Sequence, residues 1–402
     1  MNRTLFSSVI TTAVLTMAII TSCSSNTMET KSRQLVPDHD AKPNIAQLQP
    51  VQPPVVESDR TIRIGILLDT SNSMDGLIDQ AKAQLWSIVS TLSKATDQGE
   101  TPRFEVALYE YGNSGLSAST GHIRQVSAFT TDLDMISMHL FALRTNGGDE
   151  YCGQVIGTAL AELDWSSLDD DLQLLVIAGN EPFTQGSHPY SVACKRAATQ
   201  GLNVNTIFCG NYDEGVATDW KNGATTGNGH YANIDHNQAL IHIETPYDAE
   251  LAALNTKLNG TYLAYGSKGA WYKSNQMVQD GNARTMNESI YLERTVAKSS
   301  SYYDNYAWDL VDAMATEDFD LDKVSEKELP EAMQGMTKTE REEYVEAKKK
   351  ERAAIQEQIG QLAAKREAFL QKHREENGQT LGDVLIELIR KQAEAKGFTF
   401  DA

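Results

Sequence analysis

A chain of 402 residues with a formal net charge of −20 is long enough for two or three domains and for a sizeable buried core. This excess of acidic residues disfavours binding to nucleic acid or to an anionic lipid surface, because both need clustered Lys and Arg. The charge instead permits cation binding and high solubility, so we expect no nucleic-acid partner.

The first residues are typical of a targeting segment and not of a fold. Arg3 supplies a short positive region, and the apolar stretch 5–20 is followed by Thr and Ser ahead of Cys23. This arrangement resembles the lipobox of bacterial lipoproteins, in which the Cys is acylated; an ordinary secretory signal with a chance Cys is the alternative. The resemblance implies a signal peptide over residues 1–22 and stable anchoring of Cys23, since each buried CH₂ of its acyl chains contributes about 0.8 kcal/mol.

Residues 23–58 are rich in Ser, Gln and Pro, and they show no apolar periodicity. Such a composition indicates a flexible tether, which the Pro-Val-Gln-Pro-Pro sequence near its end turns into a stiffer stalk. No stretch after the targeting segment is long enough and apolar enough to span a bilayer.

Between residues 59 and 243, patterns of strands and helices alternate. The expected strands cover residues 62–68, 104–111, 122–129, 172–178, 204–209 and 230–234. The expected helices cover residues 77–92, 132–143, 152–163, 190–199 and 217–224. Because the strands are nearly continuous apolar runs, we predict an α/β fold with a doubly wound, mostly parallel sheet covered by helices on both faces. Ligands of such sheets bind at the carboxyl ends of the strands.

One of these strand ends carries the most informative motif. The apolar strand 62–68 is followed by Asp69, Ser71 and Ser73, so that one carboxylate and two hydroxyls precede a helix. Hard oxygen ligands of this kind suit Mg²⁺, which takes one or two protein carboxylates and keeps several waters, with Mn²⁺ or Ca²⁺ as alternatives. The structural alternative is a strand end followed by a Ser helix cap.

The Asp-x-Ser-x-Ser spacing after a buried strand resembles the metal-ion-dependent adhesion site of von Willebrand factor type A (vWA) domains, and residues 59–243 as a whole resemble such a domain. In that family, a second loop supplies a Thr or an acid to the metal. The corresponding loop here contains a Gly pair, and we favour Asp149 as its ligand, with Glu150 and Thr145 as alternatives.

The third loop departs from the family pattern. Family members often carry Thr-Asp-Gly at the end of the fourth strand, whereas this chain has Ala-Gly-Asn-Glu-Pro. The resemblance therefore implies that Asn180 or Glu181 replaces the missing Asp, either directly or through a water.

Further segments resemble a group of bacterial vWA lipoproteins: residues 178–186, 193–195, 204–210, 245–248, 258–262 and 301–314. The resemblance implies a vWA protein of the bacterial cell envelope that is held in a lipid bilayer through Cys23. Because Ser24 and not Asp follows this Cys, the outer membrane is the expected location, with the folded part facing the periplasm or the cell surface.

Three further cysteines, Cys152, Cys194 and Cys209, are expected toward the edge of the sheet that carries Asp69. Export of the protein from the cytoplasm would permit a disulfide to form. Because the number of these cysteines is odd, at least one thiol stays free or pairs with another chain. The favoured disulfide pairs are Cys152–Cys209 and Cys152–Cys194. It is equally plausible that the three cysteines form no disulfide and pack as small buried hydrophobic side chains.

Residues 244–320 are predicted to form an aromatic-rich extension packed on the vWA domain, with a helix over 248–258. A glycan or peptide platform is the alternative for these aromatic residues. Residues 321–402 are predicted to form a charged helical tail. Its first long helix begins at a capping box with Thr337 and ends at Gly378, and a final amphipathic helix begins at Thr380. Its apolar stripe is a weak signal for a coiled coil, and a helical hairpin fits it equally well.

These features favour a membrane-anchored, non-enzymatic binding protein that uses a divalent metal to engage an envelope or extracellular protein, whose Asp or Glu completes the coordination. A structural envelope protein with a vestigial metal site is the first alternative. A phosphatase-like hydrolase is the second, because a strand ending in Asp69 also resembles aspartyl phosphatases; these need a second Asp where this chain has Ser71. The sequence contains no Gly-x-Ser-x-Gly, Gly-x-Gly-x-x-Gly or His-Glu-x-x-His motif.

Overall fold

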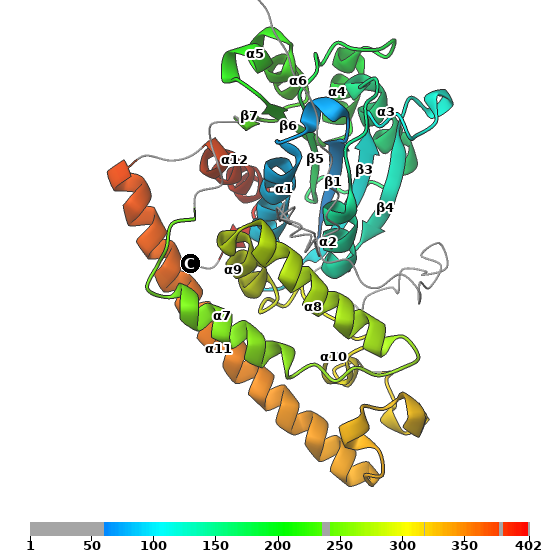
Figure 1. Ribbon diagram of the computed structural model, residues 1–402, viewed down its shortest axis with the longest axis vertical. Coiled ribbons are helices and arrows are strands. Elements are labelled where there is room, and N and C mark those ends of the chain that lie inside the picture. The colour runs from blue at the N-terminus through cyan, green and yellow to red at the C-terminus, as the bar shows by residue number, and fades with distance from the viewer. Residues whose placement is uncertain (1–59, 235–241, 317, 378–380, 401–402) are drawn as a thin grey trace, which may run out of the picture. The chain divides into compact units, whose positions relative to one another are not determined.

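The computed structural model describes residues 60–234, 242–316, 318–377 and 381–400 (Figure 1). The expected signal peptide, the tether and the acylated Cys23 lie outside these residues. In the described part, six strands form one sheet in the order β4-β3-β1-β5-β6-β7. The strands are β1 Thr61–Asp69, β3 Arg103–Tyr111, β4 Arg124–Thr130, β5 Leu172–Gly179, β6 Asn203–Cys209 and β7 Tyr231–Ile234.

The sheet is parallel except for β4, which pairs antiparallel with β3 at one edge. The chain builds outward from β1 to β3 and β4, and then crosses to the other side of β1 for β5, β6 and β7. The strand order therefore reverses between β1 and β5, which is where doubly wound sheets bind ligands.

Helices cover both faces of the sheet, so the strands are buried on two sides and consist mainly of apolar residues. Ile64, Ile66 and Leu68 of β1 belong to one hydrophobic core, which includes residues of α1 and α2, whereas Leu67 belongs to the core on the other face with α3 and α4. These helices are α1 Ile78–Leu92, α2 Leu133–Ala142, α3 Cys152–Glu162 and α4 Tyr190–Thr199.

The single short helix expected over residues 217–224 is instead two helices, α5 Tyr212–Ala217 and α6 Trp220–Thr226. Asp219 separates them with a φ of 72°, a left-handed conformation that interrupts the helical path. With this exception the expected elements occur, and the predicted fold class is confirmed as a doubly wound, mostly parallel sheet with C-terminal helices.

Four helices follow the sheet: α7 Asp248–Asn259, α8 Gly269–Met286, α9 Glu288–Ala297 and α10 Leu310–Ala313. Aromatic residues of this region are packing residues in large part, since Tyr262, Tyr303 and Trp308 are buried. The sequence patterns did not predict α8, because its buried face carries polar side chains in place of an apolar stripe: Asn275, Gln276, Gln279, Asp280 and Asn282.

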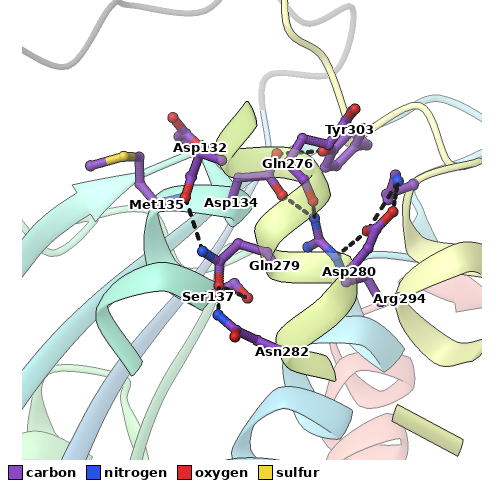
Figure 2. A network of polar contacts seen from close by, with 12 residues as sticks. Asp132, Asp134, Met135, Ser137, Gln276, Gln279, Asp280, Asn282, Arg294 and Tyr303 are labelled. Carbon is purple, nitrogen blue, oxygen red and sulfur yellow. Dashed lines mark hydrogen bonds and ion pairs between the residues drawn. The ribbon is translucent and has the colours of Figure 1, made fainter. Parts of the chain in front are cut away.

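A buried polar network joins α8 and α9 to α2, as Figure 2 shows. Arg294 of α9 lies between Asp134 of α2, at 2.5 Å, and Asp280 of α8, at 2.7 Å. Lys298 also contacts Asp280, at 2.8 Å, and the Tyr303 hydroxyl donates to Asp134. Two acids and two basic groups thus balance one another, which is what burial of charged side chains requires.

The C-terminal helices α11 Lys338–Asn377 and α12 Leu381–Ala395 pack on the rest of the fold. Buried Arg352 joins α11 to Asp309 at 2.8 Å, and Arg366 joins it to Asp248 at 3.0 Å. Leu385 of α12 lies in the same hydrophobic core as β1, and β8 Thr399–Phe400 pairs antiparallel with β2 Ala95–Thr96. None of the helices that the structure describes is long and apolar enough to cross a membrane.

Candidate metal site

Asp69 is the last residue of β1 and lies at the carboxyl edge of the sheet, next to the point where the strand order reverses. Its side chain is fully buried, and Oδ1 accepts a hydrogen bond of 2.7 Å from the backbone N–H of Ser71. The turn after Asp69 then brings the hydroxyls of Ser71 and Ser73 within 2.7 Å of each other.

Ser73 connects this first loop to the other two loops of the site. Its Oγ lies 3.3 Å from Glu150 Oε1 of the second loop and 3.0 Å from Asn180 Oδ1 of the third. Asn180 Nδ2 in turn donates a 2.8 Å hydrogen bond to the carbonyl oxygen of Ser73. Asp69, Ser71 and Glu150 are buried whereas Ser73 is exposed, so the cluster is accessible from the Ser73 side.

Asp69 and Glu150 are two buried carboxyl groups beside each other. Burial, and then the nearby Glu150 carboxylate, raise the pKa of Asp69 well above its ordinary value, and burial raises the pKa of Glu150 as well. Among the described residues, no hydrogen-bond donor contacts Asp69 Oδ2, and no Lys or Arg forms an ion pair with either acid. Two adjacent buried carboxyls need a proton or a cation between them.

Gly112, directly after β3, permits this close approach of the two acids. A Cβ at this position would lie 2.6 Å from Asp69 Oδ1 and 2.8 Å from Glu150 Cγ, and the residue has a φ of 76°. Any larger residue would therefore displace one of the two carboxyls and would also strain the backbone.

The other predicted ligands have different surroundings. The Thr145 hydroxyl donates to Asp75, and the exposed Asp149 accepts a 3.1 Å hydrogen bond from the Tyr151 hydroxyl. Glu181 is half-buried, and its backbone carbonyl accepts from Trp220 Nε1 at 2.8 Å. The structure thus brings together Asp69, Ser71, Ser73, Glu150 and Asn180, and it directs Thr145 and Asp149 to other partners.

Two residues of this site had no signal in the sequence. Gln185, beyond the third loop, accepts a 2.5 Å hydrogen bond from the backbone N–H of Glu150 through its Oε1. Asn113, after β3, contacts both the first and the second loop. Neither residue belongs to a periodic pattern or to a motif, because both act from irregular loops.

Cys152, Cys194 and Cys209 are buried free thiols in the structure, so none of the favoured disulfide pairs is formed there. Cys152 Sγ lies 3.8 Å from the Tyr111 hydroxyl, directly after the second loop. Burial raises the pKa of all three thiols, that of Cys194 to about 12, and so keeps them protonated at neutral pH.

The donor atoms of the cluster are two carboxylates, two hydroxyls and one amide oxygen, which are hard ligands of the kind that Mg²⁺, Mn²⁺ and Ca²⁺ take. In the part of the chain that the structure describes, no group of three or more His, Cys, Asp or Glu side chains could hold a metal ion. An ion at Asp69 would therefore depend on the neutral oxygens as well as on the two acids.

No protein-family model matches the chain, and no curated protein matches it. Among solved structures, it is similar to the conserved hypothetical protein BatB from Bacteroides thetaiotaomicron, at 16% identity and a TM-score of 0.34 over 43% of this chain and 90% of that one. It is also similar to the SpRpn10 VWA domain, at 16% identity and a TM-score of 0.34 over 46% of this chain and 92% of that one.

A third similar structure is proximal thread matrix protein 1 from the mussel byssus, with a zinc-occupied MIDAS motif. Its identity is 11% and its TM-score 0.35, over 44% of this chain and 43% of that one. At these values, the fold class of the chain rests on its own strand order and not on these likenesses.

Proposed function

We propose that this chain is a binding protein that holds a divalent cation at Asp69, Ser71, Ser73, Glu150 and Asn180 and engages a protein partner through it. The observation that carries the proposal is the buried, donor-free Oδ2 of Asp69 beside the buried carboxyl of Glu150. A divalent cation between the two carboxylates compensates their charge, and the hydroxyl and amide oxygens supply further ligands. Mg²⁺ is the expected ion, with Mn²⁺ or Ca²⁺ as substitutes.

The exposure of Ser73 supports a role in binding to a partner. A cation held from the buried side by Asp69 and Glu150 keeps its positions on the Ser73 side for water or for an oxygen of another protein. We propose that an Asp or Glu of the partner takes such a position, so that a chelator switches the complex off.

The proposal is of a binding role and not of a catalytic one. Phosphatases that use an Asp at a strand end need a second acid two residues later, and Ser71 occupies that position here. The Ser71 backbone and hydroxyl are both engaged within the first loop, with Asp69 and Ser73 respectively.

We further propose that acylation of Cys23 anchors the chain in the outer membrane of a bacterial envelope, with the tether 23–58 between the bilayer and the fold. This part of the proposal rests on the sequence of the targeting segment and its lipobox.

The experiment is crosslinking of the full chain in an envelope extract, in the presence of Mn²⁺ or of a chelator. We expect a crosslinked partner with the wild type in Mn²⁺, its loss with chelator, and its loss in Asp69→Ala even with Mn²⁺. Glu250→Gln, which changes an exposed acid of α7, is the matched control and retains the crosslink. A crosslink that survives both the chelator and Asp69→Ala contradicts a metal-dependent complex.

A further inference from the structure

The turn at residues 112–114, which follows β3, lies against both the first and the second loop of the candidate metal site. At the end of β3, just before the turn, Tyr111 O accepts a 2.9 Å hydrogen bond from the Thr70 backbone of the first loop. Thr70 O in turn accepts a 2.9 Å hydrogen bond from Asn146 N of the second loop. Ser114 N lies 2.5 Å from Gly147 O, so backbone hydrogen bonds tie this turn directly to the second loop.

One side chain of the turn reinforces these backbone contacts. Asn113 Nδ2 lies 3.2 Å from the Arg144 carbonyl of the second loop and 3.4 Å from Thr70 Oγ1 of the first. Asn113 Oδ1 accepts from the backbone N–H of Gly115 at 2.9 Å, which fixes the orientation of the amide. A single side chain thus joins the end of β1, the turn after β3 and the start of the second loop.

The second loop needs such support, because it has no regular secondary structure between α2 and α3 and contains the flexible Gly147-Gly148 pair. Gly148 packs directly on the turn, since a Cβ there would lie 2.2 Å from Gly112 O. Glu150 follows two residues later, and its backbone is held on the far side by Gln185. The place of the Glu150 carboxyl beside Asp69 therefore depends on how the preceding residues are held.

We propose that Asn113 is a positioning residue, which holds the second loop so that the Glu150 carboxyl stays beside Asp69. This inference deepens the proposed function and rests on it for its effect on metal binding. Asn113 itself touches neither acid and acts through the Arg144 carbonyl and Thr70. Loss of a side chain that hydrogen-bonds directly to a metal ligand typically lowers metal affinity about 10–100-fold. Asn113 acts through the backbone of the second loop, so we expect an effect of about tenfold, at the lower end of this range.

The decisive variant is Asn113→Asp. It is nearly isosteric and keeps the acceptor for Gly115, but it has no N–H to donate to Arg144 O or Thr70. Its added negative charge would by itself strengthen cation binding, so a weaker affinity reports the changed contact with Arg144 O and Thr70, where the N–H donors are lost and the new carboxylate oxygen repels the Arg144 carbonyl. Asn203→Asp is the matched control, because Asn203 Nδ2 makes the same kind of bond to the Asn228 carbonyl at the opposite end of the sheet.

Two measurements on the full chain test the proposal. In Mn²⁺ titration calorimetry, we expect Asn113→Asp to raise the Kd for Mn²⁺ about tenfold and Asn203→Asp to leave it unchanged. Thermal unfolding of the metal-free proteins should give both variants melting temperatures near that of the wild type. In metal-free hydrogen exchange, we expect the Asn146 amide to exchange faster in Asn113→Asp than in wild type or in Asn203→Asp.

Unchanged exchange at Asn146 in Asn113→Asp would overturn the proposal, and so would an unchanged Kd. Faster exchange that extends over the whole sheet would also overturn it, since it would show a general loss of stability. If the wild type binds no Mn²⁺, the proposed function fails; the metal-free exchange then still decides whether Asn113 holds the second loop.

Discussion

Asp149 and Glu150 are adjacent acids of the second loop with opposite surroundings. Glu150 is buried beside Asp69, whereas Asp149 is exposed and bonds to Tyr151. Of these two neighbouring acids, only Glu150 reaches the first loop, where its Oε1 lies 3.3 Å from Ser73 Oγ.

This difference predicts opposite results for two conservative substitutions. We expect Glu150→Gln to weaken Mn²⁺ binding about tenfold or more, or about 1.4 kcal/mol, because it removes one of the two buried negative charges. Asp149→Asn removes an exposed charge only and should change the Kd by less than about twofold. Titration calorimetry checks both, and a larger loss in Asp149→Asn than in Glu150→Gln would assign the ligand to Asp149.

The sequence predicted part of this cluster and not the rest, for a physical reason. Asp69, Ser71 and Ser73 follow an apolar strand at fixed spacing, so their position could be read from the strand pattern. Glu150 lies in an irregular loop without periodicity, where the sequence does not show which side chain faces the end of β1. From the sequence we therefore favour Asp149 and give Glu150 only as an alternative. Asn180 and Glu181 are the two alternatives for the third loop. Reciprocal hydrogen bonds join Asn180 to Ser73, whereas Glu181 acts on the cluster through its charge, which adds to the effect of burial in raising the pKa of Glu150.

At the scale of the elements, a buried lysine joins α1 to the end of α2, directly ahead of the second loop in the sequence. Lys82 of α1 is 1% exposed, and its Nζ donates a 2.9 Å hydrogen bond to the Leu143 carbonyl just after α2. Burial lowers the pKa of Lys82 to about 8, below the value of about 10.4 in an unfolded chain. Between these two values the unfolded state binds more protons than the folded state, so the contribution of Lys82 to stability rises with pH.

Lys82→Met should remove this dependence on pH. We expect the free energy of unfolding of the wild type, relative to that of the variant, to increase by about 2 kcal/mol from pH 8 to pH 10. Lys257→Met, at an exposed site of α7, is the control and should show no such change. Urea unfolding at several pH values measures both, and a relative stability that stays flat or falls with pH contradicts the assignment.

The helices also differ in how well their sequences reveal them. Helix α1 was predicted, because its apolar residues recur at helical spacing and face the sheet. Helix α8 is not predicted, because the side chains that it buries are amides and one acid. Asp280 pairs with Arg294 of α9, and Gln279 accepts from Ser137 of α2, whereas Gln279 and Asn282 also bond within α8. Such a pairing becomes visible only when the folded chain brings Asp134, Asp280 and Arg294 together.

At the scale of the whole molecule, α12 and the residues that follow it contribute side chains to the hydrophobic core on one face of the sheet. Leu385, Ile389 and Phe398 are buried in the hydrophobic core that contains β1. The sequence predicted the amphipathic helix but not its place, since an apolar stripe does not say which surface it covers.

We therefore expect Leu385→Ala to destabilise the fold by about 2–5 kcal/mol, as loss of a buried leucine does in a packed core. Lys391→Ala, on the exposed side of α12, is the control and should change stability by less than about 0.5 kcal/mol. Denaturant unfolding measures both values. Equal, small effects would mean that α12 is a separate helix that contributes little to the core.

The proposed binding function depends on one divalent cation at the end of β1. Electron paramagnetic resonance of free Mn²⁺ during a titration measures this binding directly in the full chain. We expect one Mn²⁺ bound per wild-type chain, displaced by excess Mg²⁺, and none bound at this site in Asp69→Ala. No binding by the wild type, or equal binding by wild type and Asp69→Ala, would contradict it.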